Sequence, residues 1–461
     1  MKNMGRIHFV GIGGVGMSAL ARILLSRGFR VSGSDLKENQ FTRELVSLGV
    51  PVYYGHRPEN IPQDTVQLVV SSAISPDNPE VQEAHGRGIP VVRRGELLAR
   101  LFNSRQGVAV AGAHGKTTTT ALIAWILKEA GWNPEAAVGG HVPQFGGNVL
   151  TGSGPHFVAE ADESDGSFLW LKPSIAVITN VEGDHLEYYK NQEGLQAAFQ
   201  RFLEGLPSRA KAVLCHEDPW LREMAERHRD RAITYGWDSA LYRAREVELR
   251  GFTSRAKVYF KTTPLGEINL KIPGYHNVLN ALGALAAAQE LGVPFPVAAE
   301  AIASFTGVGR RFQVLWNKGP VVVDDYAHHP TEITATLKAA SLMGANRIIA
   351  VFQPHRYTRT KHFYREFASS LMAAPVVVIT DIYPAGEPPL DGVGAQLIVQ
   401  EMKRLNHPCV HHIHCLEDIV EFLKGSWQKG DLILTLGAGD VSRVAQDLAC
   451  YLQSREKAED K

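Results

Sequence analysis

The sequence has no excess of either charge, few cysteines and no hydrophobic run of membrane-spanning length. Lysine and arginine total 48, as do aspartate and glutamate, so no basic field attracts nucleic acid or an anionic membrane. Four scattered cysteines among 461 residues cannot form a disulfide framework. No apolar leader precedes the first predicted strand. We therefore expect a cytoplasmic protein, monomer or homodimer, that binds neither nucleic acid nor membrane and holds anions at local sites.

What the sequence does contain is a repeated alternation of short apolar runs and helical stretches. Its length predicts about three domains at roughly 150 residues each. Apolar runs predict strands at residues 7–10, 29–31, 66–70, 89–92, 107–110, 157–159, 175–178, 212–214, 321–323, 348–352, 376–379 and 432–435. This α/β pattern favours doubly wound parallel sheets. We predict a Rossmann-like N-terminal domain (1–106), a central P-loop ATPase domain (107–312) and a C-terminal Rossmann-like α/β domain (313–461).

Residues 111–120, Ala-Gly-Ala-His-Gly-Lys-Thr-Thr-Thr-Thr, form the most informative stretch. They stand between a predicted strand and a predicted helix, the arrangement of a nucleotide-phosphate loop. The glycines let backbone N–H groups turn toward phosphate oxygens, Lys116 reaches the terminal phosphates, and Thr117 is placed to bind Mg²⁺. A valine replaces the first glycine of the usual motif, so the loop is a shortened variant. The predicted ATP-binding residues here are Gly112, Ala113, His114, Gly115, Lys116, Thr117 and Thr118.

The segment Gly11-Ile-Gly13-Gly-Val-Gly16 matches a dinucleotide-binding fingerprint, and Asp35 follows the next strand as a candidate ribose ligand. Alone, this pattern indicates a nicotinamide-dependent dehydrogenase. Any nucleotide diphosphate exploits the same loop and helix end, however, and nothing downstream supplies a convincing hydride-transfer site. A sugar nucleotide such as a UDP derivative fits better beside a separate ATP site.

Polar clusters follow several other predicted strands. The run Glu160-Ala-Asp162-Glu163-Ser-Asp165 offers the carboxylates that Mg²⁺ prefers, or else is a solvated acidic loop. Asp184 and His185 end another strand and could face the same crevice. The segment 274–280 opens an Ala-rich helix predicted to end at residue 291, and its polar groups could contact a base, or Asn277 could simply cap the helix.

The third predicted domain carries two further polar segments and a His/Cys-rich one. Residues 324–330, Asp-Asp-Tyr-Ala-His-His-Pro, follow a strand, and Arg356 and Arg359 follow another. Two arginines three residues apart can grip a carboxylate or phosphate, although either could be a surface ion-pair member. The cluster at 407–415 lacks a CxxC or HxxxH unit and alternates between strand faces, which argues against a metal site.

The order of these motifs resembles the Mur ligases. The segments AGAHGKTTTT, EADESD, TNVEGDH, GYHNVLNA, GVGRRF, DDYAHHPTE and PHRYTRT carry the resemblance, which covers roughly residues 5–445. HFVGIGGVGMSALARILLSRGFRVSGSD and DDYAHHPTEI look like the branch that adds L-alanine. The resemblance implies that ATP phosphorylates the lactyl carboxylate of UDP-N-acetylmuramate and that L-alanine attacks the acyl phosphate. ATP, L-alanine, the UDP-sugar and Mg²⁺, with Mn²⁺ as an alternative, are the expected ligands.

The resemblance also implies roles for individual residues. Lys116, Glu163, His185, Arg310 and Arg311 are the expected catalytic residues, the arginines being hinge residues near the phosphates. Thr117, Glu163 and His185 would bind metal, and His276, Asn277 and Asn280 would face the adenine. His328, Arg356 and Arg359 would position the incoming amino acid. The expected UDP-sugar residues are Gly13, Gly14, Val15, Gly16, Met17, Ser18, Asp35, Ser71 and Asn78.

Two other functions stay open at this stage. One is a related ligase that attaches a recycled peptide or another amino acid to the same sugar nucleotide, since the amino-acid choice depends on a pocket volume that the sequence does not give. The other is a nicotinamide-dependent oxidoreductase with an accessory nucleotide site. NAD(H) binding would favour the oxidoreductase, and tight UDP-sugar binding without it would eliminate that function.

Overall fold

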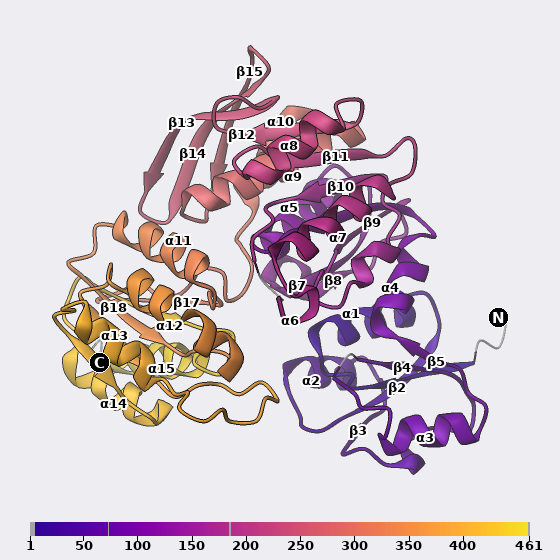
Figure 1. Cartoon of the computed structure of the whole chain (residues 1–461), viewed down its shortest axis with the longest axis horizontal. Helices are drawn as coiled ribbons and strands as arrows, with labels where there is room; N and C mark the ends of the chain where they lie inside the picture. The colour runs from indigo at the N-terminus through magenta and orange to yellow at the C-terminus, as the bar shows by residue number, and fades with distance from the viewer. Residues whose placement is uncertain (1–4, 72, 184–185, 460–461) are drawn as a thin grey trace. The chain divides into compact units, whose positions relative to one another are not determined.

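The computed structural model describes residues 5–71, 73–183 and 186–459. The strands form three sheets. The chain divides into two compact units: one comprises Met1–Glu246, Ala256–Asn269 and Leu279–Thr306, and the other comprises Val247–Arg255, Leu270–Val278 and Gly307–Lys461. Figure 1 labels most of the elements, with the chain coloured from indigo at its N-terminus to yellow at its C-terminus. Among the described residues, every helix is too short or too polar to traverse a lipid bilayer.

The first sheet is parallel and has the strand order β3-β2-β1-β4-β5. The order reverses beside β1, which lies between β2 and β4, so the carboxyl ends of β1 and β4 border a switch-point crevice of the kind that binds ligands. Its elements are β1 (Arg6–Val10), α1 (Val15–Ser26), β2 (Arg30–Asp35), α2 (Gln40–Ser47), β3 (Val52–Tyr54), η1 (Pro58–Asn60), β4 (Thr65–Val70), α3 (Pro79–Gly86), β5 (Val91–Arg93) and α4 (Arg94–Phe102).

The second sheet has ten strands in the order β15-β14-β13-β12-β11-β10-β6-β9-β7-β8. Strand β6 lies between β9 and β10, so loops that follow these three parallel strands meet at one edge. The elements are β6 (Gln106–Ala111), α5 (Lys116–Glu129), β7 (Glu135–Val142), η2 (Pro143–Phe145), β8 (Gly147–Leu150), β9 (His156–Glu160), η3 (Ser167–Trp170), β10 (Ile175–Ile178), α6 (Leu186–Tyr189), α7 (Gln192–Glu204), β11 (Lys211–Cys215), α8 (Pro219–Arg227), β12 (Ala232–Gly236), β13 (Tyr242–Arg250), β14 (Thr253–Phe260), β15 (Thr263–Leu270), α9 (Tyr275–Leu291) and α10 (Phe295–Ser304).

The third sheet has the order β16-β17-β21-β18-β19-β20, and only its edge strand β16 is antiparallel to its neighbour. Apolar side chains cover both faces of its central strands, which explains their continuous hydrophobic runs. The elements are β16 (Gln313–Trp316), β17 (Val321–Asp325), α11 (Pro330–Ser341), β18 (Arg347–Phe352), α12 (Tyr357–Leu371), β19 (Val376–Ile379), α13 (Gln396–Arg404), β20 (Val410–His412), α14 (Leu416–Ser426), β21 (Asp431–Leu436) and α15 (Ser442–Glu459).

The predicted α/β class is confirmed, and each of the twelve predicted strand segments overlaps a strand or begins beside one. The first sheet is parallel as predicted, and the other two sheets include antiparallel pairs, β7 with β8 and β16 with β17. The predicted Ala-rich helix is α9, which ends at Leu291 as expected.

Candidate functional site

The phosphate loop connects β6 to α5 and depends on two glycines. Gly112 has φ +125° and Gly115 has φ +83°, backbone conformations that other L-residues rarely adopt. A Cβ at position 115 would lie 2.4 Å from Asn280 Oδ1. Gly115 is the N-cap of α5, so the first N–H groups of a fourteen-residue helix point out of the loop, where an anion is stabilised. The structure therefore forms the predicted cradle and brings Asn280 of α9 against it.

Lys116, the first residue of α5, is paired with Glu163 in the loop that follows β9. Its Nζ lies 2.8 Å from Glu163 Oε1 and also donates to the Ala113 carbonyl at 3.2 Å. Burial disfavours the ammonium form, but the negative charges of Glu163 and Asp162 outweigh it and raise the pKa of Lys116. Burial raises the pKa of Glu163, and the lysine charge offsets this only in part. Lys116 is thus a fixed cation within the phosphate loop.

One oxygen of Glu163 is poised for a further ligand. The residue is 2% exposed, and its Oε2 is buried with no hydrogen-bond partner among the described residues. A buried carboxylate oxygen costs stability unless a cation or a hydrogen-bond donor contacts it. Mg²⁺ is such a cation, because it prefers oxygen ligands. Thr117, the other described member of the predicted metal set, is buried one residue beyond Lys116. These donors fit a magnesium ion. His185, with Asp184, lies outside the described residues.

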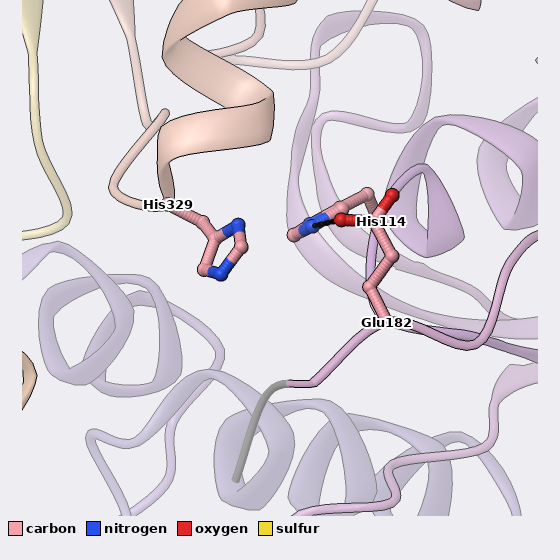
Figure 2. Close-up of side chains that lie close together, drawn as sticks. All are labelled: His114, Glu182 and His329. Atoms are coloured by element: carbon pink, nitrogen blue, oxygen red, sulfur yellow. Dashed lines mark ion pairs between the residues drawn. The ribbon is translucent and has the colours of Figure 1, made fainter. Parts of the chain in front are cut away.

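Asn180, which follows β10, holds the phosphate loop from the other side. Its Oδ1 accepts from the His114 N–H at 2.9 Å, and its Nδ2 donates to the His114 carbonyl at 3.0 Å. Thr179 Oγ1 donates to the same carbonyl at 2.6 Å. The His114 imidazole Nε2 lies 3.4 Å from Glu182 Oε2. The side chains of both residues are drawn in Figure 2. Asn180 belongs to the quoted segment TNVEGDH but was not predicted to contact this loop; its place at a neighbouring strand end was the available signal.

Arg94 is a second residue that sequence reasoning missed. It begins α4, and its Nη2 lies 3.3 Å from Asp162 Oδ2 and 3.8 Å from Asp165 Oδ2. Burial works against the carboxylate of Asp162, but Arg94 and Lys116 outweigh it and lower the pKa of Asp162. The Arg94 side chain also packs against Gly16, since a Cβ there would lie 3.1 Å from its Cδ. Arg94 therefore connects the N-terminal glycine loop with the acidic run.

The N-terminal glycine loop lies at the switch point of the first sheet. Asp35 Oδ2 accepts from the Gly13 N–H at 2.8 Å, so this carboxylate shapes the loop. Gly11 has φ +80°, and a Cβ there would lie 3.2 Å from Ser71 Oγ. Gly11 follows β1 and Ser71 follows β4, so the glycine loop and the start of the loop after β4 meet at the switch point. Ser72 lies outside the described residues.

Several predicted UDP-sugar residues have structural contacts of their own. Met17 and Ser18 are each 1% exposed in α1, and Ser18 Oγ donates to the Val15 carbonyl. Asn148 of β8 donates to that carbonyl at 2.7 Å, joining α1 to the second sheet. Asn78 Oδ1 accepts from the Glu80 N–H and caps α3. Gly14 is the N-cap of α1, followed by Val15 and Gly16 in its first turn.

The segment predicted to face the adenine forms the start of α9. Asn277 is the third residue of the helix, and its Nδ2 donates to the Pro273 carbonyl, four residues back, at 2.7 Å. This bond differs from the N-cap raised as an alternative, in which the side chain would accept from a backbone N–H. Burial, with the nearby Arg311 cation, lowers the pKa of His276 to about 4, so its imidazole is neutral at pH 7. Asn280, one turn further along, packs against the phosphate loop as described above.

The predicted hinge arginines are held in place by acidic side chains. Arg310 has φ +59°, and its Nε donates to Asp324 Oδ2 at 3.1 Å. The guanidinium carbons of Arg310 and Arg311 lie 5.0 and 5.1 Å from the centre of the Tyr326 ring. Burial raises the pKa of Asp325 to about 6, with Arg311 opposing. The cations are therefore fixed beside the carboxyl end of β17.

The residues predicted to position an amino acid gather in the second unit. The rings of His328 and His355 have centroids 5.8 Å apart. Burial, followed by the charges of Arg359 and Arg356, lowers the pKa of His355 to about 4. Arg356 has φ +69°, and its N–H donates to the Tyr383 carbonyl at 2.8 Å. His355 was not predicted as a site residue, although it stands inside the quoted motif.

The fold and this phosphate loop define a nucleotide-binding enzyme with a three-domain α/β architecture. Family models match consecutive parts of the chain: "Mur ligase family, catalytic domain" at residues 6–106, "Mur ligase middle domain" at 110–288, and "Mur ligase, glutamate ligase domain" at 310–439. The chain belongs to the Mur ligase family, whose members are ATP-dependent ligases.

Known proteins resemble the chain over nearly its full length. A UDP-N-acetylmuramate–L-alanine ligase from Carboxydothermus hydrogenoformans is 46% identical over 450 residues, covering 97% of both chains. One from Geobacter sp. is 46% identical, covering 98% of this chain and 99% of that one. The crystal structure of a UDP-N-acetylmuramate–alanine ligase from Thermotoga maritima superposes with a TM-score of 0.85 at 31% identity, covering 98% of this chain and 100% of that one.

Proposed function

We propose that the protein joins L-alanine to the lactyl carboxylate of UDP-N-acetylmuramate with hydrolysis of ATP to ADP and phosphate. The observation that carries the proposal is the Lys116–Glu163 pair in a phosphate loop, within a chain that is 44–46% identical to curated ligases of that name. A carboxylate is a poor electrophile, so ATP must first convert it into an acyl phosphate. The product is a precursor for peptidoglycan synthesis.

In the first step a carboxylate oxygen attacks the γ-phosphorus and ADP leaves. We assign Lys116 and the N–H groups of the α5 N-terminus to the transferred phosphoryl group, whose charge they offset. Thr117 and Glu163 would hold Mg²⁺, which supplies charge neutralisation between the phosphates. The hinge cations Arg310 and Arg311 are assigned to the phosphates as well. The base is assigned to His276, Asn277 and Asn280.

In the second step the amine nitrogen of alanine attacks the acyl carbon, phosphate leaves and the nitrogen loses a proton. We assign Arg356 and Arg359 to the alanine carboxylate, because a guanidinium pairs with a carboxylate in fork geometry. His328 is assigned to the amine side. Its ring is held by Glu332, whose Oε2 lies 3.3 Å from His328 Nδ1.

The UDP-sugar is assigned to the switch-point crevice of the first sheet, with the residues named in the sequence analysis. We also propose the domain boundaries 1–106, 107–312 and 313–461. The state of association, the absence of nucleic-acid binding and a cytoplasmic location stay predictions.

The decisive experiment measures phosphate release with ATP, Mg²⁺ and UDP-N-acetylmuramate while L-alanine, glycine, L-serine or a tripeptide is supplied in turn. We expect the highest kcat/KM with L-alanine. No phosphate should be released when the UDP-sugar is omitted. Phosphate release with L-alanine that does not exceed the background rate would refute the proposal. Preference for the tripeptide would favour the recycling ligase, the second candidate, because a murein peptide ligase from Psychrobacter arcticus superposes with a TM-score of 0.73 at 25% identity, covering 96% of this chain and 98% of that one. NAD(H) binding without UDP-sugar binding would favour the oxidoreductase.

A further inference from the structure

Three potential metal ligands that the ligase reaction does not use meet at the edge of the third sheet. Asp381 follows β19, His412 ends β20, and His414 lies two residues beyond it. Strands β19 and β20 are parallel neighbours, with Ile379 in register with His412. Their carboxyl ends therefore coincide, and a residue from each strand end reaches the same place although they are 31 positions apart in the sequence.

Asp381 is hydrogen-bonded to both histidines, at distances slightly shorter than those between two ligands of one metal ion. Asp381 Oδ1 lies 3.1 Å from His412 Nε2 and 3.0 Å from His414 Nδ1. Ligands at about 2.0–2.1 Å from a tetrahedral metal are separated by roughly 3.3 Å. One donor atom from each of the three residues lies within 4.8 Å of the others. A small shift of the side chains would place a metal ion between them.

The backbone that carries these ligands is fixed by hydrogen bonds, whereas two of the three side chains are mostly exposed to solvent. Thr380 Oγ1 donates to the His414 carbonyl at 3.0 Å, and the Ile413 N–H donates to the Ile379 carbonyl at 3.0 Å. The side chains of Asp381 and His414 are 56% and 66% exposed. An ion can thus enter from solvent, and water can complete its coordination.

We propose that Asp381, His412 and His414 bind a divalent transition-metal ion of the Zn²⁺, Co²⁺ or Ni²⁺ type. Two imidazoles and one carboxylate suit these ions, whereas Mg²⁺ prefers an all-oxygen set. The site is distinct in ligand chemistry from the carboxylate and hydroxyl donors of the phosphate loop. The proposal differs from the sequence-based interpretation of residues 407–415, because its third ligand, Asp381, comes from the end of a different strand, which no spacing within that segment reveals.

The site adjoins the segment around Tyr383, which is hydrogen-bonded to residues 354–356, where Arg356 is predicted to bind the amino acid. Tyr383 lies two residues beyond Asp381, and its carbonyl accepts from the Arg356 N–H while its N–H donates to the Pro354 carbonyl, both at 2.8 Å. The His355 and Tyr383 rings are stacked with centroids 5.7 Å apart. A bound ion would therefore anchor the start of a segment on which the conformation of Arg356 depends.

The test titrates Co²⁺ into the untagged full-length chain after chelator treatment, with millimolar Mg²⁺ present to occupy oxygen-rich sites. Visible absorption reports Co²⁺ coordination, and calorimetry with Zn²⁺ reports affinity. We expect Asp381→Asn, His412→Ala and His414→Ala each to weaken binding at least tenfold. His85→Ala, which removes an exposed histidine of α3, is the matched control and should bind as the wild type does.

Two results would overturn the proposal. One is a wild-type chain that shows no Co²⁺ absorption band and no Zn²⁺ heat. The other is binding that is undiminished in Asp381→Asn and His414→Ala, which would assign the ion to another site. Circular dichroism and melting temperatures of the variants identify any loss of folding, and the mostly exposed positions of Asp381 and His414 make such a loss unexpected.

Discussion

Replacement of Lys116 by methionine should affect stability and catalysis by separate and measurable amounts. Methionine keeps most of the side-chain volume but removes the cation 2.8 Å from Glu163 Oε1. Glu163, 2% exposed, would then be a buried carboxylate without its ion-pair partner. Removing one partner of a buried pair costs about 3–5 kcal/mol in unfolding free energy.

Protonation sets a limit on that cost. Glu163 can become neutral at pH 7 instead of remaining charged. Its protonation then costs about 1.4 kcal/mol of unfolding free energy for each pH unit above its ordinary pKa of 4.5, which is about 3 kcal/mol at pH 7. A carboxyl whose folded pKa lies above its unfolded value stabilises the fold less as the pH rises through that interval. The deficit of Lys116→Met should therefore be at most about 3 kcal/mol at pH 7, because the pKa of Glu163 is already raised in the wild type, and less than 1 kcal/mol at pH 5.

Urea unfolding without nucleotide at the two pH values, together with phosphate release, measures both effects. Activity should fall at least a hundredfold, since a preorganised cation at the transferred phosphoryl group is lost. The double variant Lys116→Met/Glu163→Gln is the matched control: it should recover most of the stability at pH 7 and none of the activity. Wild-type stability of Lys116→Met at pH 7, or a deficit that the double variant retains, would refute the reasoning.

The other predictions concern three positions. Gly115→Ala should weaken nucleotide binding at least tenfold by calorimetry, because its Cβ would lie 2.4 Å from Asn280 Oδ1 at φ +83°; an unchanged Kd would contradict this. A His276 pKa of about 4 makes the folded state lose up to about 2 kcal/mol of stability between pH 7 and 5, as the unfolded imidazole protonates first; His276→Gln should abolish this loss in urea titrations, and an unchanged pH dependence would argue against it. Arg359→Ala should raise the KM for alanine roughly 10–100-fold with a smaller change in the KM for ATP, as expected from a lost charged hydrogen bond; an unchanged alanine KM would reassign the residue.

The phosphate loop and the main sheet strands were predictable because local sequence specifies them. A buried parallel strand must be apolar along its length, and a loop that approaches phosphate requires glycine, so both leave a dense local signal. Strands β13 to β15 were not predicted. The nine residues of β13, Tyr242–Arg250, include three arginines and two glutamates, and several of their side chains are exposed. In β14 only alternate residues, Ser254, Ala256 and Val258, are buried, and a strand with one buried face shows alternation instead of a continuous hydrophobic run.

Pairings between distant residues were the part of the site that the sequence could not provide. Each partner alone is an ordinary polar residue: Arg94 begins a helix 68 positions before Asp162, and Asn180 lies 66 positions after His114. Strand order, which places β9 and β10 on either side of β6, brings Asn180 to His114 and the acidic run to the same edge, and Arg94 reaches Asp162 there from α4, which follows the first sheet. Once that order is known, the loops after the three strands must be neighbours. Topology, rather than any further motif, is therefore what completes the site.

The same topology explains why the cations beside the resting phosphate loop are already paired. Lys116 pairs with Glu163, and Arg94 pairs with Asp162 and, at 3.8 Å, with Asp165, so both cations face carboxylates before any substrate arrives. A nucleotide adds negative phosphates, and Mg²⁺ adds two positive charges. We expect Lys116 to exchange Glu163 for phosphate while Glu163 turns its oxygens to the ion. Because the lysine leaves its carboxylate only when a cation replaces it, nucleotide and Mg²⁺ should bind cooperatively at this loop.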